Sequence, residues 1–270
     1  MSVIKKFKAN AIPEGAGVIV NRVFGYHDTE EFDPFLMLDY LSSEKGTLSA
    51  GFPWHPHRGI ETITYLIKGN IKHEDSLGNK AVIHDGDVQW MSAGKGVMHQ
   101  EMPGEGNAEV QGFQFWLNMP AKDKMNEPSY TEIKRDEMVT FTESGVTVKV
   151  IAGQYKDVIG PIQKEVQQIN LFHVSLEAGK SLTFNRADNK QGFLFLFEGE
   201  ASLIHENLHE GVAYTLSPGE NVVKANSAVE FIYAEGLPLN EPIAWGGPIV
   251  MNTKEQLREA FEQINNGEFI

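Results

Sequence analysis

The chain has 270 residues, of which 41% are hydrophobic and 22% charged, and its formal net charge is −14 at pH 7. A chain of this length can bury a large core, and the absence of cysteine excludes disulfides, thiolate chemistry and cysteine-ligated zinc. The negative charge disfavours direct binding to nucleic acid, because such affinity rests on Lys and Arg neutralising phosphates.

Neither a membrane helix nor a signal peptide is predicted. No apolar run approaches the roughly 20 residues that a membrane helix needs, and the N-terminus has no apolar stretch of signal-peptide length. We therefore expect a cytoplasmic protein that acts away from membranes.

Short segments rich in β-branched and aromatic residues follow one another along the chain. The strands that we expect are 17–24, 35–40, 62–67, 71–75, 88–91, 111–117, 146–151, 171–176 and 193–197. A polar stretch without periodicity, 122–136, is expected to connect two halves. Turns about every ten residues are typical of an all-β barrel or sandwich.

The chain is expected to end in one amphipathic helix. Thr253 can cap it, Gln256 can complete a capping box, and Gly267 can end it. Apolar residues recur at the i, i+3, i+4 and i+7 positions of one helix face: Leu257, Ala260, Phe261 and Ile264. We expect this stripe to pack on a barrel.

Two histidine-containing segments carry the chemistry. His55 and His57 share a strand face because side chains alternate along a strand, and Glu61 has the same parity if the extended run is unbroken. Near residue 100, His99 and Glu101 also share parity. Three imidazoles and a carboxylate that point one way favour a borderline divalent metal.

Other residues near these segments have plainer interpretations. A histidine outside such a cluster is most often hydrogen-bonded in the core or exposed, and we interpret five in this way: His27, His84, His173, His205 and His209. His73 lies near a turn and is expected to be solvated. Arg58 either orients Glu61 or Glu101 by a charge-assisted hydrogen bond or lies at the surface.

A weak internal repeat suggests a duplicated barrel. Residues 65–69 resemble 195–199, and 85–87 resemble 218–220. Counting from these glycines puts no His-x-His pair in the second half. The positions that count as equivalent to His55, His57, Glu61, His99 and Glu101 hold Asn185, Ala187, Gln191, Ile232 and Ala234. We therefore expect a second half that kept the fold and lost the metal.

The motif His-x-His-x3-Glu, followed about forty residues later by Gly-x-Gly-x2-His, resembles the two motifs of the cupin superfamily. The segments 52–62, 73–75, 86–91, 93–96, 99–103 and 247–253 resemble the pirin family more narrowly. This resemblance implies an all-β fold of two tandem cupin (jelly-roll) β-barrels with a C-terminal α-helix. We expect a metal-binding N-terminal cupin domain at 1–130, and at 131–270 a degenerate C-terminal cupin domain without metal that includes the terminal helix.

The pirin resemblance also implies a site. It implies one divalent metal ion, iron or else Mn, Co, Ni, Cu or Zn, held by His55, His57, His99 and Glu101. With Glu101 on the metal, Glu61 is expected to be an inner-shell or substrate-side group. The pattern of the wider cupin superfamily would put Glu61 on the metal instead, and strand parity allows either carboxylate.

The pirin family includes quercetin 2,3-dioxygenases, so the resemblance implies an enzyme that opens flavonols such as quercetin with O2 and releases CO. Its partners would be a small aromatic substrate and O2, with Glu101 as the base. Four apolar residues either line its pocket or pack in the core: Trp90, Met91, Phe113 and Phe115. One alternative is a metal-containing, redox-sensing regulatory protein that acts through protein partners, and a weaker one is a zinc-dependent sugar isomerase.

Overall fold

The computed structural model describes residues 5–43, 50–104, 109–163, 167–204 and 206–270, so His205 lies outside the described residues. The chain forms two compact units. One unit, here the N-terminal barrel, comprises residues 10–27, 35–135 and 239–270. The other, here the C-terminal barrel, comprises residues 28–34 and 136–238 together with the start of the chain up to Ala9.

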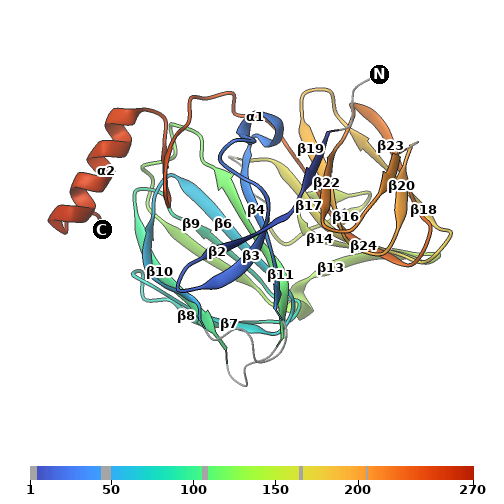
Figure 1. Ribbon diagram of the computed structural model, residues 1–270, viewed down its shortest axis with the longest axis horizontal. Helices are drawn as coiled ribbons and strands as arrows, with labels where there is room; N and C mark the ends of the chain where they lie inside the picture. Colours follow the sequence, from blue (N-terminus) through green and yellow to red (C-terminus); the bar gives the residue numbers. More distant parts are fainter. Residues whose placement is uncertain (1–4, 44–49, 105–108, 164–166, 205) are drawn as a thin grey trace. The chain divides into compact units, whose positions relative to one another are not determined.

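The N-terminal barrel contains a seven-stranded and a four-stranded antiparallel sheet (Figure 1). The larger sheet has the order β12 (Ser129–Ile133), β9 (Val88–Ser92), β6 (Ile60–Lys68), β11 (Val110–Asn118), β4 (Phe35–Ser43), β3 (Val18–Phe24) and β2 (Asn10–Glu14). The smaller sheet has the order β5 (Phe52–His57), β10 (Val97–Pro103), β7 (Asn70–Asp75) and β8 (Lys80–His84). The short pair β25 (Ala244–Gly246) and β26 (Ile249–Met251) and the helix α2 (Lys254–Asn266) complete the unit.

The C-terminal barrel repeats this architecture. Its larger sheet has the order β1 (Lys6–Lys8), β22 (Val212–Thr215), β19 (Gln191–Glu198), β24 (Val229–Gly236), β17 (Ile169–Leu176), β14 (Val146–Ala152) and β13 (Val139–Glu143). Its smaller sheet has the order β18 (Ser181–Arg186), β23 (Gly219–Ala225), β20 (Ala201–Leu203) and β21 (Glu206–Leu208). The unit also contains the pair β15 (Gln154–Tyr155) and β16 (Val158–Ile159) and the short helix α1 (Thr29–Phe32), while a 3-10 helix, Arg135–Glu137, spans the boundary between the units.

The predicted all-β fold of two tandem barrels with a C-terminal helix is confirmed. Every strand expected from the sequence is present, and the Thr253 capping box and the left-handed Gly267 cap of α2 are both formed. The region 122–136 is more than a connection, because Ser129–Ile133 forms β12 and pairs with β9. The first barrel therefore extends to Arg135, and a boundary at residue 130 falls inside a strand.

The terminal helix packs with the N-terminal barrel. The sequence analysis had assigned it to the C-terminal domain. Ala260 is buried with Ile249 and Met251 of β26, and Leu257 and Ile264 pack against the same cluster. Phe261 is 38% exposed, so the ring expected in the core lies at its edge. None of the described helices is long and apolar enough to span a membrane.

The backbone corrects the register of the internal repeat. The N–H of Gly86 donates to the carbonyl of Leu66, and the N–H of Gly211 donates to that of Leu196. Gly211, and not Gly219, is therefore the counterpart of Gly86. As a result β24 corresponds to β11 rather than to the histidine-bearing β10, whose true counterpart is β23.

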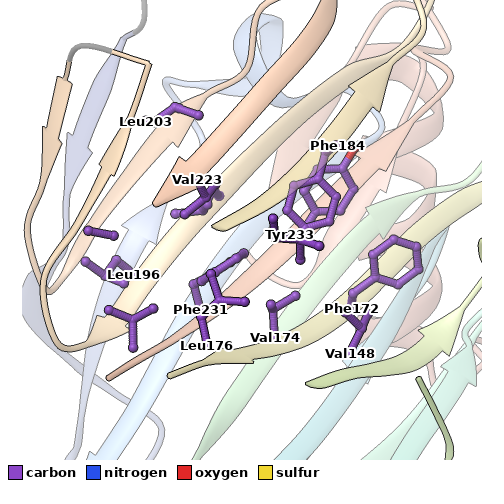
Figure 2. Close-up of a cluster of buried hydrophobic side chains, with 14 of the residues drawn as sticks. Val148, Phe172, Val174, Leu176, Phe184, Leu196, Leu203, Val223, Phe231 and Tyr233 are labelled. Carbon is purple, nitrogen blue, oxygen red and sulfur yellow. The ribbon is translucent and has the colours of Figure 1, made fainter. Parts of the chain in front are cut away.

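With this register, residues of different types occupy the histidine positions in the C-terminal barrel. Cross-strand pairs make Phe184 and Arg186 the counterparts of His55 and His57, and Asn221 and Val223 those of His99 and Glu101. Gln191 does stand at the position of Glu61. Phe184 stacks on Tyr233 with the ring centroids 4.0 Å apart, and this stack fills the barrel interior (Figure 2).

Candidate metal centre

Neighbouring strands bring three of the predicted histidines together. β5 and β10 pair so that His55 lies directly opposite His99 and His57 lies opposite Val97. The ring centroids of His55 and His57 lie 4.3 and 4.9 Å from that of His99. One nitrogen from each of these histidines lies within 4.8 Å of the other two, close enough to share a metal ion.

Backbone carbonyls set the tautomers of the first two histidines. His55 Nδ1 lies 2.8 Å from the Pro53 carbonyl oxygen, and His57 Nδ1 lies 3.0 Å from that of Pro248. Each Nδ1 must therefore carry its proton, which leaves a lone pair on each Nε2. The two Nε2 atoms are 3.1 Å apart. Since both are acceptors in these tautomers, neither neutral ring can donate to the other, whereas a bound cation would satisfy both.

His99 gives an independent reason to expect a ligand. It is fully buried, and among the described residues neither of its ring nitrogens has a hydrogen-bond partner. An unsatisfied buried polar group costs about 1–3 kcal/mol, so such a group calls for an explanation. The three residues thus fit a metal ion.

Burial keeps these imidazoles neutral, which is the form that binds metals. It lowers the pKa of His57 to about 3, aided by the neighbouring His55. Burial, followed by the charges of the nearby histidines, lowers the pKa of His99 well below its ordinary value, and burial also lowers that of His55.

Glu101 lies beside the triad rather than within it. Its carboxylate groups with His99 and His73 within 4.8 Å, but not with His55 and His57. Thr64 Oγ1 lies 3.1 Å from its Oε1. Burial raises the pKa of Glu101 to about 7, against the opposing effect of the hydrogen bond from Thr64.

His73 was wrongly expected to be solvated. It is 2% exposed and lies opposite Glu101 in the sheet. Its Nδ1 accepts from the Gln89 amide at 2.9 Å, and its Nε2 lies 3.2 Å from Asp75 Oδ2. Both ring nitrogens of His73 thus have hydrogen-bond partners, so His73 has no free lone pair for a metal and instead packs beside the three histidines. In the sequence, His73 shares strand parity with the apolar Ile71, and this parity could have revealed its burial. In the structure Ile71, His73 and Asp75 are all buried.

Glu61 is separated from the triad by a break in the strand. Gly59 adopts a left-handed φ of 75°, which ends β5 and starts β6 in the other sheet. The unbroken extended run that gave Glu61 the parity of His57 does not exist. Glu61 is buried, but it belongs to neither of the two clusters found among the described residues that could hold a metal.

Arg58 orients neither glutamate and does not lie at the surface. Its guanidinium donates to the carbonyls of Lys95 and Phe269 and to Gln263, and it lies 4.3 Å from the centre of the Phe269 ring. Arg58 therefore ties the segment that follows His57 to α2 and the C-terminus. This role depends on contacts more than 200 residues away in sequence.

A buried lysine adds a second tie that the sequence did not reveal. Lys124 is 1% exposed, and its ammonium donates to the carbonyls of Gly59 and Val250 and to Asn118. It lies in the polar stretch that was expected to be a connection, so nothing in its local sequence indicated burial.

A cavity of about 730 Å³ opens onto the histidines. His55, His57 and Glu101 line it, together with aromatic residues that the sequence did not single out: Tyr26, Phe52, Trp54, Trp116 and Trp245. Of the two roles that the sequence left open for Trp90, Met91, Phe113 and Phe115, core packing is the one observed, since all four are at most 1% exposed. Tyr26 and Trp54 are 60% and 45% exposed, so the cavity wall continues onto the surface.

Two family models match the chain: Pirin over residues 17–117, and the Pirin C-terminal cupin domain over residues 171–270. A pirin-like protein of Caulobacter vibrioides is 38% identical, with 99% of this chain and 98% of that protein covered. The chain belongs to the pirin family.

Solved structures agree with the pirin assignment. The crystal structure of quercetin 2,3-dioxygenase from Acinetobacter baumannii matches with a TM-score of 0.91 and 32% identity, covering 98% of this chain and 96% of that one. A bacterial pirin from Escherichia coli, solved in complex with nickel(II), matches with a TM-score of 0.70 and 21% identity, covering 87% of this chain and 99% of that one. At that identity the second match supports the fold alone.

Proposed function

We propose that this pirin-family protein is a metal-dependent dioxygenase that opens flavonols such as quercetin with O2 and releases CO. One observation carries the proposal: neutral imidazoles with unused lone pairs adjoin a cavity with aromatic walls. The likeness to a solved quercetin 2,3-dioxygenase supports the substrate class.

The proposed metal ligands are His55, His57, His99 and Glu101. The grouping of Glu101, and not Glu61, with His99 favours Glu101 as the carboxylate ligand. Nitrogen and carboxylate donors without thiolate suit iron, and also Mn, Co, Ni, Cu or Zn. When bound, such a metal supplies a Lewis acid for the flavonol 3-hydroxyl and open positions for O2 chemistry.

The protein's own groups would handle the proton and the ring. Glu101 is the proposed base, because its carboxylate groups with His99 and accepts a hydrogen bond from Thr64, which holds it beside the proposed metal position. Trp116 and Trp245, with ring centroids 5.8 Å apart, offer flat walls to an aromatic substrate. Their bulk would also keep water away from the proton transfer.

Replacing the base tests the proposal. Glu101→Gln keeps the shape of the side chain but cannot accept a proton, so we expect quercetin consumption to fall by about 10²–10⁴-fold while much of the metal is retained. The measurements are quercetin absorbance under O2, CO release and elemental analysis. Glu61→Gln is the matched control and should keep most of its activity.

Two results would contradict this assignment. If Glu61→Gln lost turnover and Glu101→Gln did not, the roles of the two carboxylates would be reversed. If the parent consumed no quercetin with iron, manganese, cobalt, nickel or copper loaded, the enzyme function would fail and the metal-containing regulatory protein would replace it.

A further inference from the structure

A row of polar residues crosses the larger sheet of the N-terminal barrel. Gln89, Thr64, Gln114, Asp39 and Arg22 are successive cross-strand partners on β9, β6, β11, β4 and β3. Directly paired residues in an antiparallel sheet share a face. Gln89, Thr64 and Asp39 are at most 4% exposed, so this polar row lies inside the barrel.

The same row in the C-terminal barrel is apolar or aromatic. Its successive partners are Tyr214, Leu194, Tyr233, Phe172 and Val150 on the corresponding strands. All five are at most 2% exposed and belong to one hydrophobic core cluster, in which Figure 2 labels Phe172 and Tyr233. The fold is therefore built without a polar row.

The contrast between the barrels indicates that the polar row serves a function. Burying polar groups disfavours folding unless each finds a partner, and an apolar row of similar size avoids that requirement. Two of the five residues in the polar row already have a purpose, because Gln89 contacts His73 and Thr64 contacts Glu101 in the opposite sheet.

The other three residues of the polar row face the cavity. Gln114, Asp39 and Arg22 all line it, on the same cavity as His55 and His57. Arg22 holds Asp39 through two hydrogen bonds of 2.8 Å and contacts Glu14 at 3.1 Å. Thr64 lies 2.6 Å from Gln114 Oε1, and in the described part of the chain the Gln114 amide nitrogen donates to no partner.

We propose that Asp39, Arg22 and Gln114 form a specificity site for hydroxyl groups on the phenyl ring that a flavonol carries at carbon 2. The inference rests on the proposed flavonol activity and adds the part of the substrate that is recognised. A flavonol with a catechol ring, such as quercetin, is the ligand class that the site would select.

The charges of the site favour hydroxyl donors over anions. One guanidinium faces two carboxylates, Asp39 and Glu14, so the group carries a net negative charge. The Asp39 carboxylate can accept hydrogen bonds beyond those from Arg22, because each of its oxygens has two lone pairs. A substrate carboxylate or sulfate at this position would be repelled.

The test compares quercetin with galangin, a flavonol whose phenyl ring at carbon 2 has no hydroxyl groups. We expect the parent to prefer quercetin in kcat/KM, and Asp39→Asn to reduce that quercetin-to-galangin ratio by about 10- to 100-fold, the loss typical of hydrogen bonds to a charged group. Glu109→Gln, which alters an exposed pair with Lys68 outside the cavity lining, is the control and should leave the ratio unchanged.

A second variant and a second readout keep the two proposals separable. Glu14→Gln alters the exposed end of the ion group and should reduce the ratio less than Asp39→Asn, so it serves if Asp39→Asn does not fold. Calorimetric titration of the metal-loaded protein with each flavonol, in the absence of O2, measures binding without turnover.

Each outcome then has one meaning. If the parent turns over flavonols but both variants keep the parent's ratio, the specificity site is refuted and the dioxygenase function stands. If no flavonol is consumed but the parent binds quercetin more tightly than galangin and the variants do not, the site stands and the dioxygenase function fails. Equal binding of the two flavonols by the parent would overturn the site.

Discussion

The environment of His99 is evidence that this site binds a ligand. A fully buried imidazole with both nitrogens unpartnered among the described residues is an energetic burden unless something binds it. Its neighbours His55 and His57 each donate an Nδ1–H hydrogen bond to a backbone carbonyl, which leaves their Nε2 lone pairs available. The three imidazoles therefore offer unused lone pairs in an arrangement that suits a metal ion.

Replacing His99 tests this interpretation through stability. His99→Leu removes two unsatisfied nitrogens, so the metal-free variant should be at least as stable as the metal-free parent. The parent should gain about 2.7 kcal/mol at a metal concentration 100 times the Kd, and the variant should lose most of that gain. Chemical denaturation with and without metal measures both quantities.

An exposed histidine provides the control for this measurement. His84→Ala should keep the metal-dependent gain, because His84 lies on the surface of the same barrel. A His99→Leu variant that the metal stabilises as strongly as the parent would remove His99 from the site.

At the scale of elements, the segment after the histidine strand is clamped from several sides. Gly59 makes the left-handed turn between β5 and β6, and a Cβ there would lie 2.1 Å from the Val250 carbonyl. The Lys124 ammonium donates to the carbonyls of Gly59 and Val250, and the Pro248 carbonyl accepts a hydrogen bond from His57 Nδ1. The region from β25 to α2 is thus part of the support of the candidate metal centre.

The helix α2 itself is expected to stabilise this support modestly through Phe261. Because the Phe261 ring is 38% exposed, Phe261→Ala should lower the free energy of unfolding by about 1–2 kcal/mol, less than the 3–5 kcal/mol typical of a fully buried ring. Denaturant unfolding measures the change.

A position on the inner face of the helix calibrates that value. Ala260 is fully buried, so Ala260→Leu should destabilise by about 1–3 kcal/mol through overpacking. A loss above 3 kcal/mol for Phe261→Ala would mean that the ring is more deeply packed than its exposure indicates.

At the scale of the whole molecule, two copies of one fold have different interiors. The N-terminal barrel has a polar row and a histidine cluster. The C-terminal barrel has Phe184, Arg186 and Asn221 at the histidine positions and apolar or aromatic residues such as Tyr233 along the row. None of these side chains is an imidazole or a carboxylate, and neither of the two clusters found among the described residues that could hold a metal lies in this barrel. We therefore propose that the C-terminal barrel is degenerate and binds no metal.

This difference predicts one tightly bound metal ion per chain. Elemental analysis of metal-loaded protein should give one metal in the parent and little in His57→Ala. Asn221→Ala, at the counterpart of His99, should keep the metal, although it removes hydrogen bonds to the backbone at Ser217 and Gly219. Two tightly bound ions per chain would contradict the assignment.

Features that depend on local patterns could be predicted from the amino-acid sequence alone. Runs of β-branched and aromatic residues between turns predicted the strands, and Thr253, Gln256 and Gly267 predicted both ends of α2, because strand propensity and helix capping are short-range effects. The His-x-His and His-x-Glu spacings predicted which side chains share a face, and the structure brings His55, His57 and His99 together.

Features that depend on pairing between distant strands could not be predicted from the sequence and became visible in the fold. The burial of His73 and Lys124, the anchoring of Arg58 at the C-terminus and the separation of Glu61 from the histidines all follow from contacts between segments far apart in the chain. The polar row is the clearest case, since its five residues come from five strands. Cross-strand register is set by the packing of whole sheets, and a linear pattern of residues does not contain it.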